Sequence, residues 1–347
     1  MRSVKIHGAL GDSILLVGEK LSNIDKYING ENIVIITDTQ MWHYYKDDFP
    51  ACDVIKIGSG EKVKTLDTVR EIYSQLMDLE IQRSSFIVGI GGGVVCDITG
   101  FVASTYLRGL RFGFVASTLL SQVDASVGGK NGVNFNGYKN MVGVFNQPQF
   151  VICDLNLLKT LPERELLNGF AEIVKHAVIK DPNLFGYLEK KYLKALALDT
   201  GVLEKLVYDS VVIKAFIVNT DEKEKGERRK LNFGHTFGHK IEKVAGVSHG
   251  EAVSAGMAAA SLLSVNRGLL AASNMERIEC LLKKLKLPVR IPVDGKRVID
   301  ALKKDKKREG KSIHFVLLKD IGNAIVEKIS IKELKKITGN HLLRLSR

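Results

Sequence analysis

Short apolar runs alternate with amphipathic stretches in the first half of the chain. The run 32–38 is apolar up to its polar end, which predicts a buried parallel strand. Residues 65–79 carry apolar side chains at the spacing of a helix. The runs 86–90 and 111–116 are predicted strands, and the first leads directly into the glycines 91–93. Strands that alternate with helices indicate a Rossmann-like, doubly wound α/β domain.

The second half of the chain has the three-to-four-residue periodicity of helices, with proline and glycine between the segments. The predicted helices are 163–180, 184–197, 201–219, 235–245, 250–268 and 274–286. A short apolar run, 314–318, predicts one strand near the end. The change of pattern near residues 155–162 predicts two domains: an α/β domain, 1–158, and a mainly α-helical domain, 159–347.

Composition is that of a globular protein, because 45% of the 347 residues are hydrophobic and 26% are charged. The four cysteines form no CxxC pair, which argues against a disulfide scaffold or a thiolate zinc site and favours a reducing compartment. The N-terminus lacks the apolar stretch of a signal peptide. The apolar run Ala252–Val265 is too short to span a bilayer and predicts a buried helix. We therefore expect a cytoplasmic protein with no membrane partner.

The net charge of +12 is unevenly distributed. Residues 1–155 hold 14 basic and 16 acidic residues, whereas the remainder holds 37 and 23, a net charge of +14. Such an excess fits nucleic acid, a membrane surface or an anionic substrate. Aromatic residues make up only 7% of the chain, and the spacings typical of helix-turn-helix, RRM and zinc-finger modules are absent. The charge therefore favours a small anionic substrate over nucleic acid.

A glycine-rich segment, Gly89–Asp97 (GIGGGVVCD), follows a predicted strand and begins a helix. Glycines there allow close approach of a pyrophosphate to the backbone and to the helix N-terminus. The segment does not match GxGxxG, because Val94 occupies the last glycine position. The alternative is a turn that only serves tight strand–helix packing. Asp38, at the end of another strand, is a candidate ligand for ribose hydroxyls or a simple helix cap.

Three of the eight histidines lie within 15 residues of one another. His235 and His239 share one helical face, and His249 starts the next predicted helix. A catalytic zinc site needs three nitrogen or oxygen ligands and one open position. Glu172, in an otherwise apolar helix, is a candidate third ligand. The alternatives are histidines that only form hydrogen bonds and a surface ion pair of Glu172 with Lys175.

Several basic residues stand close to glycine or asparagine, where they suit recognition of phosphate and carboxylate groups. They are Arg108, Lys130, Lys139, Lys214 and Arg228, with a separate basic cluster at 303–308. Taken singly, each is better explained as a solvated surface charge.

Together these motifs resemble the 3-dehydroquinate synthase family, from Asp38 to about Gly322. The blocks that carry the resemblance are Gly60-Glu61-x-x-Lys64, Gly91-Gly-Gly-Val-Val-x-Asp97, Gln122-Val-Asp124-x-Ser-Val-Gly-Gly-Lys130, Lys139-Asn140, Leu161-Pro-x-Arg-Glu165, Gly169-x-Ala-Glu172-x-x-Lys175, Asn232-Phe-Gly-His235-Thr-Phe-Gly-His239 and His249-Gly-Glu251. So many blocks in one order are far more specific than any one of them.

The resemblance implies an N-terminal NAD-binding domain, a C-terminal domain that holds zinc, and a homodimer. It implies conversion of 3-deoxy-D-arabino-heptulosonate 7-phosphate to 3-dehydroquinate and phosphate, a lyase step of the shikimate pathway towards chorismate and the aromatic amino acids. The implied chemistry is transient oxidation by NAD⁺, β-elimination of phosphate, re-reduction and intramolecular aldol closure. Such a His/Glu site also accepts Co²⁺.

The resemblance also implies roles for individual residues. The implied metal ligands are Glu172, His235 and His249. The positions implied for NAD are Asp38, Glu61, Lys64, Gly92, Gly93, Val94, Asp97, Ser117, Thr118, Lys130, Lys139 and Thr160. The positions implied for substrate and catalysis are Asp124, Lys130, Asn140, Lys175, Lys214, Arg228, Asn232 and His239, with Arg108 reaching across the dimer and Lys306 or Lys307 joining from the basic cluster. His239 is the implied proton carrier.

Four departures from the family pattern stand near these positions. Cys96 replaces a glycine beside the cofactor phosphates, which predicts weaker NAD binding because a side chain needs room there. Ser117 replaces a threonine and keeps the hydroxyl. Tyr138 replaces a glycine, and Asn131-Gly132 replaces Thr-Ala. The last two leave open a substrate with a different pattern of ring substituents.

Two related activities are therefore alternatives. One is another sugar-phosphate cyclase, such as a 2-deoxy-scyllo-inosose or valiolone-type synthase, which shares NAD and zinc. The other is a metal-dependent polyol dehydrogenase such as a glycerol dehydrogenase, which would release NADH. Lys130, Asn140 and the 232–239 block favour the dehydroquinate synthase family.

Overall fold

The computed structural model describes residues 1–347 except 9–10, 29–31, 304–307, 310–311, 331 and 335–347. The chain divides into two compact units. The first comprises Met1–Pro162 and Leu203–Glu222, and the second comprises Glu163–Val202 and Lys223–Arg347. Residues 203–222 lie within the predicted helical domain but pack with the first unit.

The first unit contains, within the described residues, a seven-stranded sheet of order β1-β2-β9-β6-β5-β3-β4. Its strands are β1 (Arg2–Ile6), β2 (Ser13–Val17), β3 (Ile33–Asp38), β4 (Asp53–Ile57), β5 (Phe86–Gly91), β6 (Arg111–Ala116) and β9 (Phe150–Cys153). β1 pairs antiparallel with β2, and every other neighbouring pair is parallel. The predicted α/β sheet is thus confirmed, and its parallel strands place their carboxyl ends at one edge.

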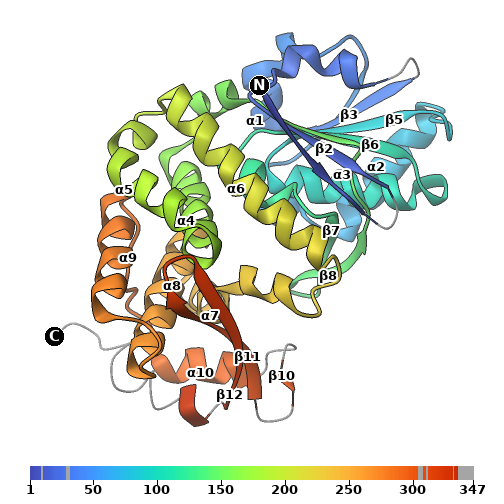
Figure 1. Ribbon diagram of the computed structural model, residues 1–347. Helices are drawn as coiled ribbons and strands as arrows, with labels where there is room; N and C mark the ends of the chain where they lie inside the picture. Colours follow the sequence, from blue (N-terminus) through green and yellow to red (C-terminus); the bar gives the residue numbers. More distant parts are fainter. Residues whose placement is uncertain (9–10, 29–31, 304–307, 310–311, 331, 335–347) are drawn as a thin grey trace. The chain divides into compact units, whose positions relative to one another are not determined.

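Helices cover both faces of this sheet (Figure 1). They are α1 (Thr39–Tyr45), α2 (Leu66–Asp78) and α3 (Gly93–Thr105), with the 3₁₀ helix η1 (Leu21–Tyr27). Along β5, Phe86, Val88 and Ile90 pack with residues of η1 and α1 in one buried cluster. Gly89 faces α3 instead, and a Cβ there would lie 2.7 Å from Thr99 Oγ1. Gly89 is therefore required for close packing of α3 on the sheet.

A separate two-stranded hairpin completes the first unit. It consists of β7 (Lys130–Phe135) and β8 (Tyr138–Phe145), which pair antiparallel. β7 also packs against α3. The sequence analysis did not predict these two strands, although they carry several of its candidate residues.

The second unit is mainly helical, as predicted. Its helices are α4 (Glu163–Lys180), α5 (Pro182–Leu196), the start of α6 (Thr200–Thr220), the 3₁₀ helix η7 (Glu227–Asn232), α7 (His235–Ala245), α8 (His249–Asn266), α9 (Ala272–Lys284) and α10 (Gly295–Lys303). A small sheet of β10 (Arg308–Glu309), β11 (Ser312–Asp320) and β12 (Asn323–Ser330) accompanies them. The sequence analysis predicted one of these strands, at 314–318, which lies within β11.

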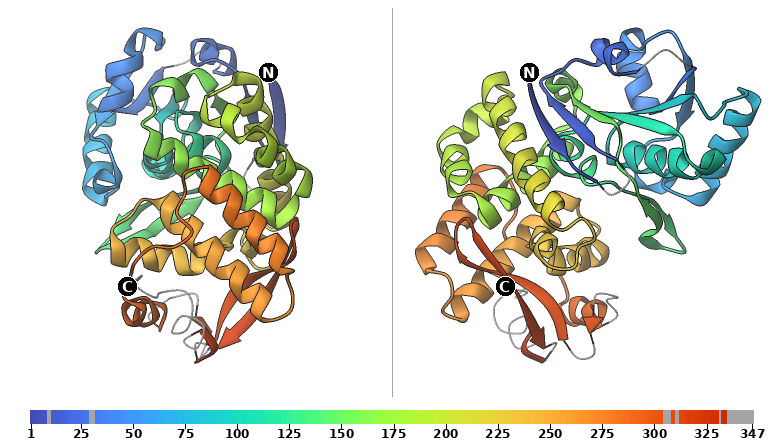
Figure 2. Two further views of the ribbon diagram at one scale, coloured as in Figure 1. Left: turned by 90° about the vertical axis from the view of Figure 1, so that its left-hand side faces the viewer. Right: turned by 45° about the vertical axis from the view of Figure 1, so that its right-hand side comes forward.

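Helix α8 is the core of the second unit. It packs against α4, α7, α9 and β11 (Figures 1 and 2). Its side chains are mostly small and buried, which confirms the buried helix predicted for 252–265. A Cβ on Gly256 would lie 2.0 Å from the carbonyl oxygen of Gly234, directly before α7. Small residues on α8 therefore permit the close crossing that brings the histidines of α7 to the start of α8.

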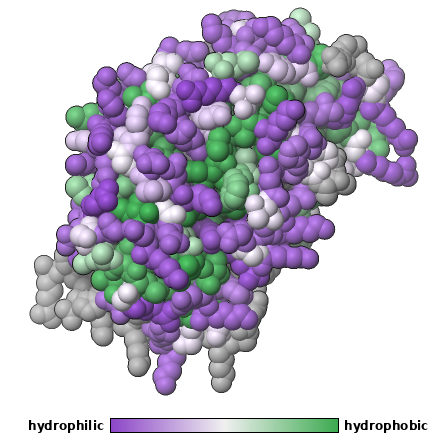
Figure 3. All heavy atoms as spheres, viewed as in Figure 1, coloured by the Kyte–Doolittle hydropathy of each residue, from purple (hydrophilic) through white to green (hydrophobic). Residues whose placement is uncertain are grey.

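Hydrophilic residues dominate the face shown in Figure 3, with hydrophobic residues in smaller areas between them. Across the described part of the chain, none of the helices combines the length and hydrophobicity needed to cross a bilayer.

Candidate active site

The carboxyl edge of the parallel sheet collects most residues proposed to bind a cofactor. Asp38 ends β3, Glu61 and Lys64 follow β4, the Gly91–Gly93 turn follows β5, and Ser117 follows β6. In the sheet, β4 lies on one side of β3, and the next strand along the chain, β5, lies on the other side of β3. This reversal of strand order is where open α/β sheets bind dinucleotides.

The glycine-rich turn fits both roles considered for it, tight strand–helix packing and phosphate binding. Gly91 lies against Val95, and a Cβ there would approach the Val95 side chain to 2.5 Å, so this glycine serves packing. Gly92 is the N-cap residue of α3, whose first N–H groups suit a phosphate. Asp38 caps α1 by accepting hydrogen bonds from the N–H groups of Gln40 (2.8 Å) and Met41 (3.0 Å). The simple cap considered for Asp38 is therefore present.

A charged cluster around the buried Lys64 connects the loop after β4 with α3 and β8. Lys64 Nζ forms an ion pair with Asp97 and donates a hydrogen bond to Asn140 Oδ1 at 2.6 Å. Lys64 is only 4% exposed. Burial raises the pKa of Asp97 to about 6, although the positive charge of Lys64 opposes the shift. Three predicted residues thus form one hydrogen-bonded group.

A second charged pair lies elsewhere in the first unit. Lys214, on α6, donates to Asp124 Oδ1 at 2.7 Å, and its side chain is buried. Lys130 and Lys139, on the hairpin, are exposed. Arg108 is also exposed and has a left-handed backbone (φ +70°) between two other residues of positive φ.

Two of the residues that depart from the expected pattern, Cys96 and Asn131, are buried inside the fold. The Cys96 thiol is buried and directed to the Gly91 carbonyl (3.8 Å), and burial strongly raises its pKa. Room for this side chain is therefore found inside the fold, and the physical reason for expecting weaker NAD binding is removed. Tyr138 is 55% exposed at the start of β8.

Asn131 is likewise buried and directed towards α3. Its Nδ2 donates to the carbonyl oxygens of Gly129 (3.1 Å) and Asn146 (2.8 Å). A Cβ on Gly100 of α3 would lie 2.1 Å from Asn131 Oδ1. Asn131 therefore packs directly against the glycine at position 100.

The contact between Gly100 and Asn131 predicts that Gly100→Ala changes the free energy of unfolding in opposite directions with and without the Asn131 side chain. Gly100→Ala should lower the free energy of unfolding by about 1–3 kcal/mol, because the methyl group overpacks a held side chain. In an Asn131→Ala background the same change should be neutral or stabilising by up to about 1 kcal/mol, from helix propensity. Urea unfolding of the four proteins measures both values. Equal effects in the two backgrounds would contradict the pairing.

The second unit brings a carboxylate and two imidazoles together. Glu172 lies on α4, His235 starts α7 and His249 starts α8, and one potential ligand atom from each lies within 4.8 Å of the others. Glu172 Oε1 is 3.4 Å from His235 Nε2 and 3.1 Å from His249 Nε2. His239 is one turn further along α7, with its ring centroid 6.3 Å from that of His249. Helical spacing left His235 and His239 as alternatives, and the structure groups His235 with the other two.

Hydrogen bonds orient both imidazoles. His235 Nδ1 lies 3.1 Å from the Phe233 carbonyl oxygen, so Nδ1 is the protonated nitrogen and Nε2 presents its lone pair to Glu172. Burial lowers the pKa of His235 well below its usual range. For His249, burial lowers the pKa, but the hydrogen bond to Glu172 and the nearby negative charge of Glu242 outweigh burial and raise it to about 9.

Helix ends place these side chains. The Gly250 N–H donates to Asn168 Oδ1 at 2.7 Å, one turn before Glu172 on α4. Ser248 and Glu251 form a capping box that fixes the first turn of α8, where His249 lies. Gly234, with φ +78°, permits the turn into α7. The three candidate ligands therefore come from rigid helix positions.

The sequence analysis missed Glu242. Its Oε2 is 3.6 Å from His249 Nδ1, on the side of the ring opposite Glu172. Spacing could have suggested it, because His235, His239 and Glu242 lie at positions i, i+4 and i+7 of one helix.

The remaining candidates of the second unit that the structure describes are Lys175, Arg228 and Asn232. Lys175 and Glu172 are buried and form an ion pair one helical turn apart. Arg228 in η7 is buried, and Asn232 Nδ2 donates to Glu224 Oε1 at 2.6 Å. Lys306 and Lys307 lie outside the described residues.

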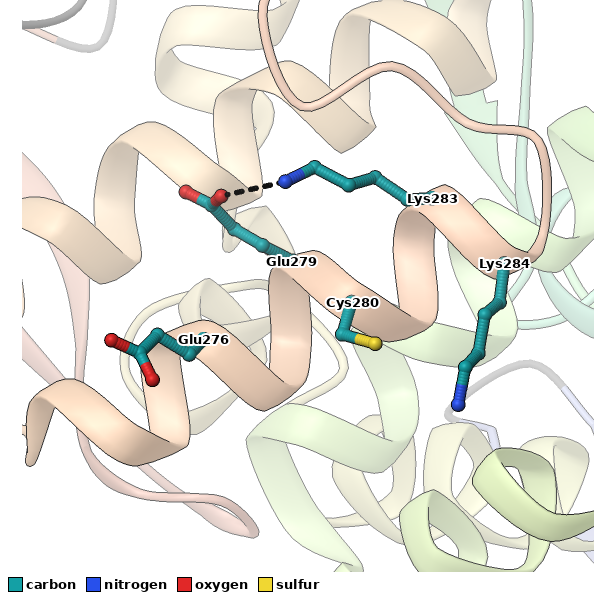
Figure 4. A pocket seen from close by; sticks show the side chains of 5 residues that line it. All are labelled: Glu276, Glu279, Cys280, Lys283 and Lys284. Atoms are coloured by element: carbon teal, nitrogen blue, oxygen red, sulfur yellow. Dashed lines mark hydrogen bonds and ion pairs between the residues drawn. The ribbon is translucent and has the colours of Figure 1, made fainter.

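A pocket on α9 involves none of these residues. It is lined by Glu276, Glu279, Cys280, Lys283 and Lys284, all from one helix (Figure 4). Lys283 and Glu279 form an ion pair across one turn, at 3.4 Å.

Two family models match the chain in succession. The model described as 3-dehydroquinate synthase N-terminal matches residues 54–168, and the one described as 3-dehydroquinate synthase C-terminal matches residues 169–308. A protein named 3-dehydroquinate synthase from Coxiella burnetii is 40% identical over 343 residues, which cover 94% of this chain and 95% of that protein.

Solved structures of related cyclases have the same fold. A 2-deoxy-scyllo-inosose synthase with carbaglucose-6-phosphate, NAD⁺ and Co²⁺ is 25% identical, with a TM-score of 0.88 over 97% of this chain and 99% of that one. The 2-epi-5-epi-valiolone synthase of Streptomyces hygroscopicus, with NAD⁺ and Zn²⁺, is 27% identical, with a TM-score of 0.86 over 97% and 98%. Sequence and fold agree: the chain belongs to the 3-dehydroquinate synthase family.

Proposed function

We propose that this protein converts 3-deoxy-D-arabino-heptulosonate 7-phosphate to 3-dehydroquinate and phosphate, the lyase step of the shikimate pathway. Identity of 40% to a named 3-dehydroquinate synthase over nearly the whole chain supports this substrate over those of the cyclases at 25–27%. The observation that carries the proposal is the convergence of Glu172, His235 and His249.

These three residues fit a divalent metal. One carboxylate oxygen and two imidazole Nε2 atoms form the donor set of a catalytic zinc site with an open position. The bond of His235 Nδ1 to Phe233 leaves the correct nitrogen for a metal. A bound Zn²⁺ or Co²⁺ would supply a Lewis acid for the reacting oxygen.

The carboxyl edge of the sheet fits NAD⁺. The residues that would hold it are Asp38, Glu61, Lys64, Gly92, Gly93, Val94, Asp97, Ser117, Thr118, Lys130, Lys139 and Thr160. NAD⁺ would accept a hydride from the substrate and return it. Lys64, already held by Asp97 and Asn140, is positioned without a search through rotamers, which favours binding.

Basic and amide side chains would bind the anionic substrate. We assign this role to Arg108, Lys130, Asn140, Lys175, Lys214, Arg228 and Asn232, with Asp124 orienting Lys214. Arg228 and Lys214 are buried, where a cation recognises phosphate or carboxylate strongly. His239, beside the metal candidates, would carry a proton at an imidazole nitrogen. Fixing a flexible chain in one geometry favours ring closure.

We also propose that the enzyme is a cytoplasmic homodimer in which Arg108 reaches the partner's site. All four cysteines are free thiols, which fits a reducing compartment. The exposed, left-handed position of Arg108 suits contact with another subunit.

The test combines purified protein with the heptulosonate 7-phosphate, NAD⁺ and Zn²⁺ and follows phosphate release and NADH absorbance, with and without EDTA. We expect phosphate release without net NADH, stopped by EDTA and restored by Zn²⁺ or Co²⁺. Net NADH would indicate a polyol dehydrogenase. Absence of phosphate release would overturn the proposed substrate and direct the assay to other sugar phosphates.

Glu242 should tune the affinity for metal through His249. Glu242→Gln removes the negative charge beside Nδ1, and the Kd for Zn²⁺ should rise about tenfold, the lower end of the effect of such residues. Competition with a chromogenic chelator measures this Kd. The matched control is Glu276→Gln on the exposed face of α9, which should leave Zn²⁺ affinity unchanged. Equal affinities of all three proteins would show that Glu242 does not act on the metal.

A further inference from the structure

Asn134, near the end of β7, joins two segments that carry candidate binding residues. Its Nδ2 donates to Glu61 Oε1 at 2.8 Å, and its Oδ1 accepts a hydrogen bond from the Asn140 N–H at 2.9 Å. Its own backbone N–H donates to the Lys64 carbonyl oxygen at 2.9 Å. One residue therefore ties the loop after β4 to the start of β8.

The contact with Asn140 matters because of that residue's backbone. Asn140 has φ +52°, in the left-handed region that costs free energy for a residue with a side chain. The hydrogen bond from its N–H to Asn134 stabilises this conformation. The Asn140 side chain in turn accepts from Lys64 Nζ at 2.6 Å. Loss of the Asn134 side chain would free both the backbone and the direction of Asn140.

The contact with Glu61 acts on the other segment. Glu61 is exposed, so its carboxylate has many accessible rotamers unless a neighbour holds it. The amide of Asn134 provides that restraint. Glu61, Asn134, Asn140 and Lys64 thereby form a closed ring of interactions between the two segments.

We propose that Asn134 is a positioning residue that couples cofactor binding to substrate binding. It directs Glu61 towards NAD⁺ and Asn140 towards the sugar phosphate, and it contacts neither the reacting atoms nor the metal candidates. The inference rests on the proposed function for the roles of Glu61 and Asn140.

The first experiment uses Asn134→Ala in the full-length protein. Without its side chain we expect the Kd for NAD⁺, measured by calorimetry, to rise about tenfold, the effect of one lost hydrogen bond to a charged group. The KM for the heptulosonate 7-phosphate should rise several-fold, with a smaller change in kcat. The matched control is Asn136→Gly at the exposed turn of the same hairpin, where φ is +48° and glycine is tolerated. It should leave both constants unchanged.

A second experiment exchanges the charges of residues 134 and 61, to distinguish a positioning role of Asn134 from a purely structural one. Asn134→Asp keeps the acceptor for Asn140 but repels Glu61, so NAD⁺ affinity should fall more than substrate affinity. In a Glu61→Gln background the amide of residue 61 can donate to the new carboxylate, and Asn134→Asp should then weaken NAD⁺ binding less than it does in the natural protein.

Two results would overturn the inference. One is additive effects of Asn134→Asp and Glu61→Gln on the Kd for NAD⁺. The other is an Asn134→Ala protein that unfolds at a lower temperature but keeps natural Kd and KM values, which would show a structural role alone. Failure of the unmodified protein to release phosphate would instead contradict the proposed function, while calorimetry would still test Asn134.

Discussion

Replacing His235 by alanine is expected to abolish tight binding of a divalent metal and to lower turnover about a thousandfold, equivalent to about 4 kcal/mol. The physical reason is the loss of one of three converging ligand atoms, which leaves Glu172 and His249 alone to hold the ion. Lewis-acid activation by a metal is worth several kcal/mol. Metal content by atomic emission, followed by assays of phosphate release, measures both effects.

The neighbouring histidine provides the matched control. His239→Asn, one helical turn away on α7, should retain the metal but lower turnover by about 10²-fold or more, because the variant loses a proton carrier. The pair distinguishes a ligand from a site histidine on the same helical face. Metal retained in His235→Ala and lost in His239→Asn would exchange the two assignments. Unchanged turnover of His239→Asn would remove its proposed role.

The second large effect is expected from Lys175→Met. Glu172 and Lys175 form an ion pair with both side chains buried, so removing the Lys175 cation leaves the buried Glu172 carboxylate with only its contacts to His235 and His249. Breaking one partner of a buried pair costs about 3–5 kcal/mol. We expect the free energy of unfolding in EDTA to fall by that amount, and Zn²⁺ to restore part of it, because a cation beside Glu172 replaces the lost charge.

A more exposed ion pair on α9 is the matched control for the buried pair of Lys175 and Glu172. Lys283 is 61% exposed and lies 3.4 Å from Glu279 (Figure 4), also within one helical turn. Lys283→Met should change the free energy of unfolding by less than about 1 kcal/mol, as for other surface pairs, and Zn²⁺ should not alter that difference. Urea titrations of the unmodified protein and both variants, with EDTA and with Zn²⁺, give the loss of unfolding free energy for each variant under each condition. Similar small losses in both variants would show that burial does not amplify the charge at Lys175.

Local pattern predicted much of the secondary structure. The structure has the strand 111–116 and the helices 163–180 and 235–245 with the predicted limits. This agreement follows from the periodicity of apolar side chains, which is a local property. The hairpin β7–β8 was missed because its exposed residues, such as Phe135 and Met141, do not alternate with polar ones in the usual way. The short strands β1, β2, β4 and β9 were also missed. β2 and β9 pair with each other from opposite ends of the first unit's strand-forming segment, which no local pattern shows, whereas β1 forms a short hairpin with β2.

The sequence by itself determined the α/β and helical halves, the family resemblance and the set of residues from which a site could be built. The resemblance implied Glu172, His235 and His249 as one ligand set, but residue spacing did not, and the tertiary structure decided which side chains meet. Spacing shows that His235 and His239 share a face, but the positions of α4 and α8 decide that His235 lies beside Glu172 and His249. The same holds for Glu242 beside His249, Asn131 against Gly100 and Asn134 between Glu61 and Asn140. The reason is physical: helical and strand periods fix which side chains point together, whereas the neighbour they meet depends on long-range packing.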